Sequence, residues 1–365
     1  MNEDRGAAGP VTAPGAAAPG AAITTDAAAW DAFVASTPPS PYLQTTTWAA
    51  VKALNGWERA AVAVAGPAGP IGAQVLTHRV GPAPWSVGYA PRGPVAPALA
   101  LDEAGVRRWT AALRALAAHR RISHVVVDPE IETGGPEASW FLAAGWRPAA
   151  SPQPARSRWI DLALPADELW ADLRGKWRQY VQKARRSGVV VTEGGLSDLA
   201  AFYAIYAETA ERAGFTHRTE ATYRAAFAGF AARGAARLLF ARDESGAPVA
   251  TLMLIGWGRR VVEPYGGMTV AGAASRANYL LKWEAIRSSQ ERGFATYDLW
   301  GLSHAGIEQF KSGFGGREVT YIGGLELVVQ PLVRHAVVGA QALRVWRERR
   351  RLVRAGGGRA TTMEP

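Results

Sequence analysis

The stretch PVATLMLIGWGRRVVEPYGG, residues 248–267, decides the fold class of this chain. It consists of two apolar runs rich in β-branched residues, and the Gly258-Arg259 pair between them is typical of a turn in an antiparallel strand pair. A helix-like segment at 274–293 follows, and the apolar run FATYDLWG comes next at 294–301. A strand pair that leads through a helix into another strand indicates an α/β domain.

The same order of elements occurs in both halves of the chain. In the second half we predict, before this stretch, a helix at 166–188, a strand at 189–194, helices at 198–213 and 220–233, and a strand at 236–243. In the first half we predict a helix at 43–57, strands at 59–66, 71–80 and 86–95, a helix at 102–121 capped by Asp102, and a strand at 122–130. The sequence therefore predicts two similar α/β units in tandem.

The composition indicates where the two units begin and end. A Pro-rich segment at 151–159 separates them, and the N-terminal segment is rich in Ala, Pro and Gly without the layout of a secretory signal. We assign disordered tails to 1–25 and 355–365, a first unit to 26–155, a second unit to 156–327, and a basic helix to 328–354. Because no run approaches the roughly 18 apolar residues that span a bilayer, we expect a cytoplasmic protein.

Charge and cysteine content narrow the classes of function. The chain has no Cys, and its six His residues are scattered, so thiol chemistry is excluded and we expect no metal site. The formal charge of +10 favours an anionic partner, such as nucleic acid, a phosphorylated substrate or anionic lipid. The sequence does not decide the role of two basic segments. The segment 176–186 and the Arg cluster at 347–354 fit either phosphate contact or solvated helix ends, and the latter also fits contact with the inner face of a membrane.

Lysine is rare in this sequence. Only five of the 41 basic residues are Lys, namely Lys52, Lys176, Lys183, Lys282 and Lys311. A compact ammonium and a planar guanidinium serve different sites, so a lysine kept in an arginine-rich chain carries more information than usual. Lys311 lies in the segment GIEQFKSGFGG at 306–316, where the simple alternative is an exposed lysine at a helix end before a glycine cap.

Several motifs resemble one family when they are read in order. They are LQTTTWAAVK at 43–52, YAPRGPV at 89–95, HVVVDPE at 124–130, KWRQYVQKARRSGV at 176–189, FTHRTEATY at 215–223, PYGG at 264–267, NYLLKWEAI at 278–286, YDLWG at 297–301 and GIEQFKSGFGG. Together they resemble the FemABX peptidyltransferases over residues 43–327. That family transfers an amino acid from aminoacyl-tRNA to the stem peptide of a peptidoglycan precursor.

This resemblance implies a fold, an activity and partners. The fold would be two tandem domains of the GNAT N-acyltransferase type, with the final helix returning to the first domain. The short connection at 192–198 leaves no room for the helical arm that some members carry. The implied partners are aminoacyl-tRNA as co-substrate, without a cofactor, and UDP-MurNAc-pentapeptide or its lipid-linked form. We expect a monomer.

The resemblance also implies site residues. The family's Phe-Lys pair falls on Phe310 and Lys311, where an ammonium would stabilise the oxyanion of aminoacyl transfer or bind substrate phosphate. Lys52 matches a position that contacts the phosphates of the precursor, although a solvated helix lysine is an equal alternative. Thr216 and Arg218 match a loop that grips the same phosphates, and a guanidinium suits this role better.

Three further positions match less closely. Tyr265 fits a tyrosine that lines the same groove, although a tyrosine at a strand end is more often part of a core. Tyr89 is a looser match, and Arg92 in the same motif could take its place at the phosphates. Asp128 and Asp298 end strands, so each is a candidate either for proton transfer or for capping a helix.

Two other functions remain open from the sequence. An acyl-CoA-dependent N-acyltransferase on the same fold would bind pyrophosphate with a glycine-rich loop before a helix, and AGAASRANYLL at 271–281 lacks that pattern. A non-catalytic RNA-binding protein is supported by the charge alone, because the sequence has no recognisable RNA-binding module.

Overall fold

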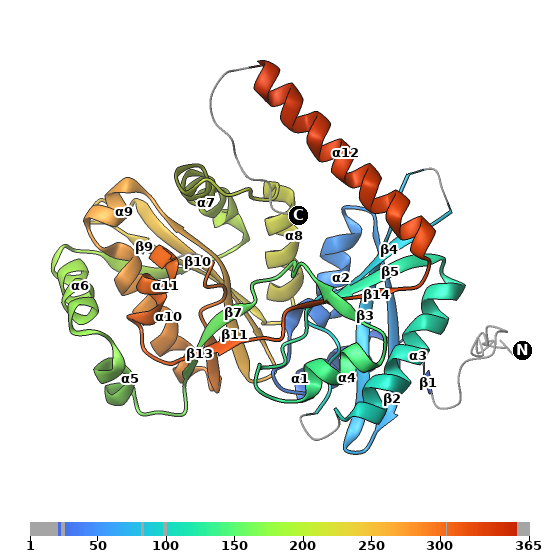
Figure 1. Ribbon diagram of the computed structural model, residues 1–365. Helices are drawn as coiled ribbons and strands as arrows, with labels where there is room; N and C mark the ends of the chain where they lie inside the picture. The colour runs from blue at the N-terminus through green and yellow to red at the C-terminus, as the bar shows by residue number, and fades with distance from the viewer. Residues whose placement is uncertain (1–20, 23–25, 82–83, 98–100, 304, 356–365) are drawn as a thin grey trace, which may run out of the picture.

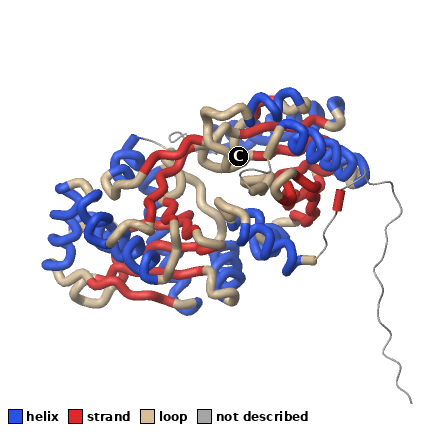
Figure 2. Tube along the Cα trace, turned by 90° about the horizontal axis from the view of Figure 1, so that it is seen from below, coloured by secondary structure: helices blue, strands red, loops and turns tan. Residues whose placement is uncertain are grey.

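The computed structural model describes residues 21–22, 26–81, 84–97, 101–303 and 305–355, and it contains two α/β domains (Figure 1). Each domain is a seven-stranded sheet with helices beside it, as the tube view shows from below (Figure 2). The predicted tails lie largely outside the described residues. Within the predicted N-terminal tail, Ala21–Ala22 instead form β1, which pairs with the edge of the first sheet.

The first sheet has the strand order β1-β2-β3-β4-β5-β14-β6. Its strands are β2 (Trp57–Gly66), β3 (Gly69–Arg79), β4 (Ser86–Ala90), β5 (Ile122–Val127), β6 (Arg147–Ala149) and β14 (Gly324–Val328). Its helices are α1 (Ala27–Ser36), α2 (Thr46–Ala53), α3 (Glu103–His119) and α4 (Glu137–Ala143). The carboxylate of Asp102 accepts from the amide of Gly105 at 2.6 Å, which confirms the predicted cap of α3.

The second sheet has the strand order β13-β7-β12-β11-β10-β9-β8. Its strands are β7 (Arg156–Asp161), β8 (Val190–Gly194), β9 (Ala236–Arg242), β10 (Pro248–Trp257), β11 (Arg260–Met268), β12 (Thr296–Asp298) and β13 (Arg317–Thr320). Helices α5 (Ala166–Asp172), α6 (Gly175–Arg186), α9 (Val270–Ala274), α10 (Ala277–Glu291) and α11 (Ala305–Ser312) accompany it, together with α7 (Leu199–Ala213) and α8 (Glu220–Ala231). The stretch 248–267 forms the antiparallel pair β10–β11, as predicted.

One strand of the predicted second unit belongs to the first sheet. After β13, the chain crosses back, and β14 inserts between β5 and β6, where Leu325 pairs with Val127 and with Pro148. Leu325 and Leu327 fill the first core, which explains why this apolar segment leaves the second domain. The sequence could not show this exchange, because an apolar strand fits the core of either sheet.

The predicted helix at 166–188 is two helices. Leu173 has an extended backbone and is buried in the second core, and the amide of Arg174 donates to the carbonyl of Gly313 at 2.9 Å. The break therefore turns the chain so that both α5 and α6 pack on the second core. Because Leu173 continues the helical spacing of apolar residues, the sequence alone did not indicate this break.

The two domains share a small core. Tyr42, Leu43 and Trp48 of the first domain pack with Phe230 and Val262 of the second, and α2 contacts α8 directly. The 3₁₀ turn Tyr42–Gln44 precedes α2 and occupies the start of the predicted helix 43–57. This contact places the 3₁₀ turn and α2 of the first domain against α8, β10 and β11 of the second.

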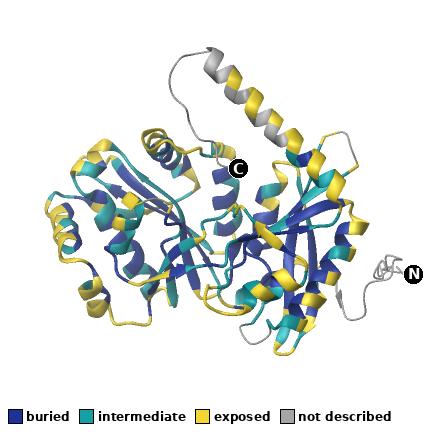
Figure 3. Ribbon diagram, in the orientation of Figure 1, coloured by how far each residue is buried: buried dark blue, intermediate teal, exposed yellow. Residues whose placement is uncertain are grey.

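The last helix, α12 (Pro331–Ala355), starts on the first domain, as predicted, and then projects from it (Figure 1). The Nε of Arg334 donates to Glu326 of β14 at 2.9 Å, and Val337 is buried. Farther along, Leu343 and Trp346 are exposed, and the described side chains of this helix are mostly in the exposed class (Figure 3). These two apolar side chains are therefore not part of the core of either domain.

Candidate functional site

The pairing of β11 with β12 in the second sheet ends beside the contact between the domains. β12 pairs with β11 only from Arg260 to Val262, while β11 continues to Met268. Beyond Val262, β11 continues without a paired residue of β12, and Lys282 of α10 contacts Glu263 there, while Lys311 of α11 contacts Trp300 after β12. Strand ends that separate in an α/β sheet commonly position the reactive groups of a site.

Lys311 lies on α11 with its ammonium directed at the backbone that follows β12. Its Nζ donates to the carbonyl of Trp300 and, at 2.8 Å, to the carbonyl of Gly301. Burial lowers the pKa of Lys311 to about 8, with the carboxylate of Glu263 acting in the opposite direction. The alternative of a fully exposed helix-end lysine is therefore wrong, because this ammonium is partly buried and held by two acceptors.

Phe310 packs into the second core next to Lys311. Its ring lies 5.2 Å from the ring of Tyr279 and 5.3 Å from that of Phe314, and its carbonyl accepts from the indole of Trp177 at 2.9 Å. These contacts fix α11, and with it Lys311, on the domain. A direct contact of Phe310 with substrate remains a prediction.

Sequence reasoning missed a buried ionic group beside Lys311. Lys282 of α10 forms an ion pair with Glu263 of β11, and the hydroxyl of Tyr297 donates to the same carboxylate at 2.7 Å. Burial raises the pKa of Tyr297 well above its usual range, so the hydroxyl stays protonated. The scarcity of lysine was the available indication, since two of the five lysines belong to this region.

A second group of side chains comes from three separate segments. Lys52 lies on α2, Arg218 precedes α8, and Tyr265 of β11 lies close enough to Arg218 and Tyr42 to interact electrostatically with both. Burial and then the positive charge of Arg218 lower the pKa of Lys52 to about 8. The Lys52 ammonium, the nearby guanidinium of Arg218 and the tyrosine hydroxyls beside them form a candidate anion site.

The structure thus brings together three of the predicted substrate-binding residues. Lys52, Arg218 and Tyr265 interact across the domain boundary, and Thr216 lies in the same exposed loop as Arg218. Tyr42 was missed, because its position next to a predicted helix gave no indication of its long-range partners. The binding roles themselves remain predictions.

The anion site predicts a pH dependence. Because Lys52 loses its charge as pH rises through about 8, we expect its contribution to the affinity for inorganic pyrophosphate to fall by about tenfold between about pH 7 and pH 9. Calorimetric titration at several pH values measures this. Lys52→Arg should keep the affinity at high pH, and Lys52→Met should lose affinity at neutral pH. Equal affinity and equal pH dependence in Lys52→Met would contradict the site.

Tyr89 and Asp128 form a different group, within the first domain. The hydroxyl of Tyr89 donates to Asp128 at 2.8 Å and accepts from the amide of Gln153 at 3.1 Å. Asp128 also accepts from the backbone amides of Arg92 and Gln153, and burial raises its pKa. Asp128 therefore ties together three segments and caps no helix. Substrate binding by Tyr89 remains a prediction.

The structure contradicts the predicted role of Arg92 in binding the phosphates of the precursor. Its side chain is almost fully buried, its Nη2 donates to the carbonyl of Pro154 at 2.9 Å, and its Nε lies 3.5 Å from Glu130. Its guanidinium also lies 4.9 Å from the ring of Trp300 and 4.8 Å from that of Tyr321. A buried arginine with these neighbours joins the domains and is not available to a ligand.

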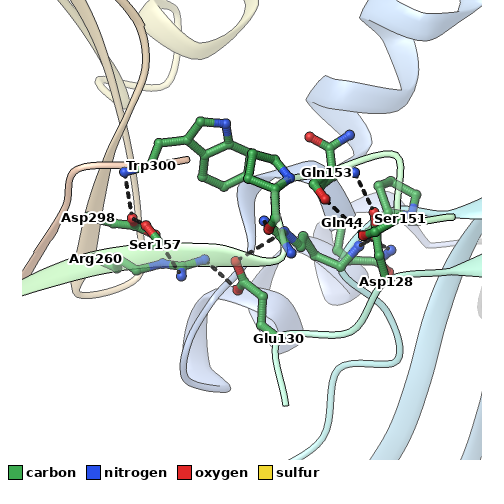
Figure 4. Close-up of polar contacts among 12 residues, drawn as sticks. Gln44, Asp128, Glu130, Ser151, Gln153, Ser157, Arg260, Asp298 and Trp300 are labelled. Atoms are coloured by element: carbon green, nitrogen blue, oxygen red, sulfur yellow. Dashed lines mark hydrogen bonds and ion pairs between the residues drawn. The ribbon is translucent and has the colours of Figure 1, made fainter. Parts of the chain in front are cut away.

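Arg92 begins a chain of buried ion pairs that crosses between the domains (Figure 4). Glu130 pairs with Arg260 of β11 at 2.6 Å, and Arg260 pairs with Asp298 of β12 at 3.3 Å. Asp298 in turn accepts from the hydroxyl of Ser157 and from the backbone amide of Trp300. Asp298 is thus a structural ion-pair partner, neither a helix cap nor an isolated base.

The basic segment of α6 is partly engaged in the fold. Arg178 donates to the carbonyl of Ala171 at 2.7 Å, and Arg185 pairs with Glu284 at 2.8 Å. Lys176 lies 5.7 Å from the ring of Tyr180 and remains exposed. Within the described ranges, no group of three or more His, Asp or Glu could hold a metal ion, and no helix has the length and apolar character to cross a membrane.

Comparison with known sequences gives matches over both domains. The FemAB family matches residues 25–134, and the acetyltransferase (GNAT) domain matches residues 171–312. A protein of Staphylococcus aureus (strain MRSA252) that bears the name Lipid II:glycine glycyltransferase is 30% identical over 203 residues, which are 52% of this chain and 47% of that protein. The chain thus spans about half the length of this relative.

Comparison with solved structures agrees on the fold. The crystal structure of FemX covers 86% of this chain and 99% of its own, with a TM-score of 0.75 and 20% identity. A tandem GNAT protein from the clavulanic acid biosynthesis pathway covers 85% of this chain and 98% of its own, with a TM-score of 0.53 and 12% identity. The predicted pair of GNAT-like domains is confirmed, and the match of residues 25–134 to the FemAB family and the Staphylococcus aureus relative support the predicted resemblance to the FemABX family.

Proposed function

We propose that this protein transfers an amino acid from aminoacyl-tRNA to an amine of the stem peptide of a peptidoglycan precursor. The observation that carries the proposal is the pairing of two sites at one domain boundary. The cations Lys52 and Arg218 form a candidate anion site there, and the partly buried ammonium of Lys311 lies against the backbone that follows β12 in the second sheet. The name of the Staphylococcus aureus relative supports the same class of acceptor.

Each group has a part in this reaction. The precursor's amine attacks the carbonyl carbon of the aminoacyl ester, and the carbonyl oxygen becomes negatively charged in the tetrahedral intermediate. An ammonium at Lys311 stabilises that oxyanion, and it is already ordered by the carbonyls of Trp300 and Gly301. When the intermediate collapses, the ester C–O bond breaks, and the ribose hydroxyl leaves with the proton given up by the amine.

The phosphates of the precursor fit the anion site. Arg218 offers a guanidinium that can bind two phosphate oxygens, and Lys52 offers a point charge from the other domain. The hydroxyls of Tyr265 and Tyr42, which interact electrostatically with Arg218, lie near the same phosphate position.

Acyl-CoA is the competing donor. In this chain the start of α10 carries Arg276 in a left-handed conformation, with φ at 64°, where a glycine would let the backbone approach a pyrophosphate. Its guanidinium lies 4.6 Å from the ring of Tyr180, over the surface of α6. This arrangement favours a donor other than CoA.

The donor and acceptor can be tested together. We expect purified protein to add one amino acid to UDP-MurNAc-pentapeptide or to its lipid-linked form when a mixed pool of charged tRNA is supplied, as measured by product mass. Treatment of the pool with ribonuclease should abolish the product. Transfer that proceeds from acyl-CoA and is insensitive to ribonuclease would contradict the proposal and establish the CoA-dependent function instead.

A further inference from the structure

Trp300 has an unusual conformation at the start of the loop after β12. Its φ is 52°, in the left-handed region that a bulky residue adopts only when its surroundings impose it. The residue after it, Gly301, is also left-handed, with φ at 47°. This turn directs two successive carbonyls at the same ammonium, that of Lys311.

The backbone of Trp300 is held from both sides. Its amide donates to Asp298 at 2.8 Å, and its carbonyl accepts from Lys311 (Figure 4 shows the first contact). Asp298 is itself fixed by Arg260 and by the hydroxyl of Ser157. Trp300 therefore connects the Lys311 ammonium to the buried chain of ion pairs.

The side chain of Trp300 faces the other domain. Its ring lies 6.0 Å from the ring of Tyr42 and 4.9 Å from the guanidinium of Arg92, both in the first domain. Tyr42 interacts electrostatically with Tyr265 and Arg218 of the candidate anion site. Trp300 thus contacts the anion site through its ring and Lys311 through its carbonyl.

We propose that Trp300 is a positioning residue, which uses the contact between the domains to hold the Lys311 ammonium in place relative to the anion site. The role as a positioning residue for transfer rests on the proposed function, whereas the effect on Lys311 does not. If the first domain moves away from Trp300, the turn loses the contacts that impose it, and Lys311 loses its two acceptors. An ammonium without acceptors is more mobile and more accessible.

The reactivity of Lys311 tests this directly. With only five lysines in the chain, the rate of acylation of each amine by an N-hydroxysuccinimide ester can be followed by peptide mass spectrometry on the native protein. We expect Trp300→Ala to raise the rate at Lys311 by about tenfold or more relative to Lys176, and Trp300→Phe to restore most of the protection. Ser157→Ala, which removes one hydrogen bond to Asp298, should give a smaller increase.

A matched tryptophan supplies the control. Trp257 also lies near an arginine, 5.9 Å from Arg233, and packs on Phe230 at the domain contact, away from Lys311. Trp257→Ala should leave the Lys311 rate unchanged, even if stability falls. Where transfer is measurable, Trp300→Ala should lower kcat by about tenfold or more, with a smaller change in the KM for the precursor. Unchanged Lys311 reactivity in Trp300→Ala and Ser157→Ala would overturn the proposal, whether or not the protein catalyses transfer.

Discussion

Replacement of Lys311 by Met is expected to lower the turnover number of aminoacyl transfer by about 100-fold or more. This is the size of effect seen when one donor to an oxyanion is removed from an active site. Steady-state kinetics with the charged tRNA pool measure it. A loss in kcat would assign Lys311 to the oxyanion, whereas a raised KM for the precursor would assign it to phosphate binding.

Lys311→Arg should be nearly as damaging, although it retains the positive charge. The ammonium approaches two carbonyls in a partly buried space, which a larger planar guanidinium cannot enter in the same way. Because Lys311→Met leaves those two carbonyls without a donor, we also expect it to lose about 1–3 kcal/mol of stability. Arg107→Met, which removes an exposed cation from α3, is the control. Near-full activity in Lys311→Met would remove Lys311 from the site.

The second large effect is expected at Glu130. Its side chain is 2% exposed and lies between Arg92 and Arg260. In Glu130→Ala, Arg92 loses its carboxylate partner and two buried guanidinium groups face each other, so we expect the free energy of unfolding to fall by about 3–5 kcal/mol. Urea denaturation followed by tryptophan fluorescence and circular dichroism measures the change.

An exposed ion pair provides the comparison. Glu103 and Arg107 are one helical turn apart on α3, and Glu103→Ala should cost less than about 1 kcal/mol. Glu130→Gln keeps an acceptor for Arg260 and should fall between the two. If Glu130→Ala is no more destabilising than Glu103→Ala, the buried chain does not hold the domains together.

The sequence predicted which helices and strands form far better than it predicted where they end and which sheet each strand joins. Apolar patterns at 248–267 and 274–293 depend on local periodicity, and both gave the observed strands and helix. The break between α5 and α6 and the return of β14 to the first sheet each depend on which of the two cores buries a particular apolar segment. Such a choice depends on the whole fold, and a single sequence does not record it.

The site was predictable where it depended on scarce residue types in ordered motifs. The resemblance singled out Lys52, Arg218 and Tyr265, which interact across the domain boundary, and Lys311, which is held within the second domain. Arg92 was assigned wrongly, because a sequence does not distinguish an arginine that binds phosphate from one that is buried against Glu130. Tyr42 and Trp300 were missed as site residues, since their significance arises from contacts between distant segments.

The insertion of β14 between β5 and β6 has a consequence for how the protein is made. β6 contacts the first sheet only through β14, so this edge of the first domain stays incomplete until residues 324–328 have left the ribosome. The second sheet, whose last strand is β13, has all its strands before then. During synthesis from the N-terminus, the first domain is therefore the first to emerge and the last whose sheet can be completed.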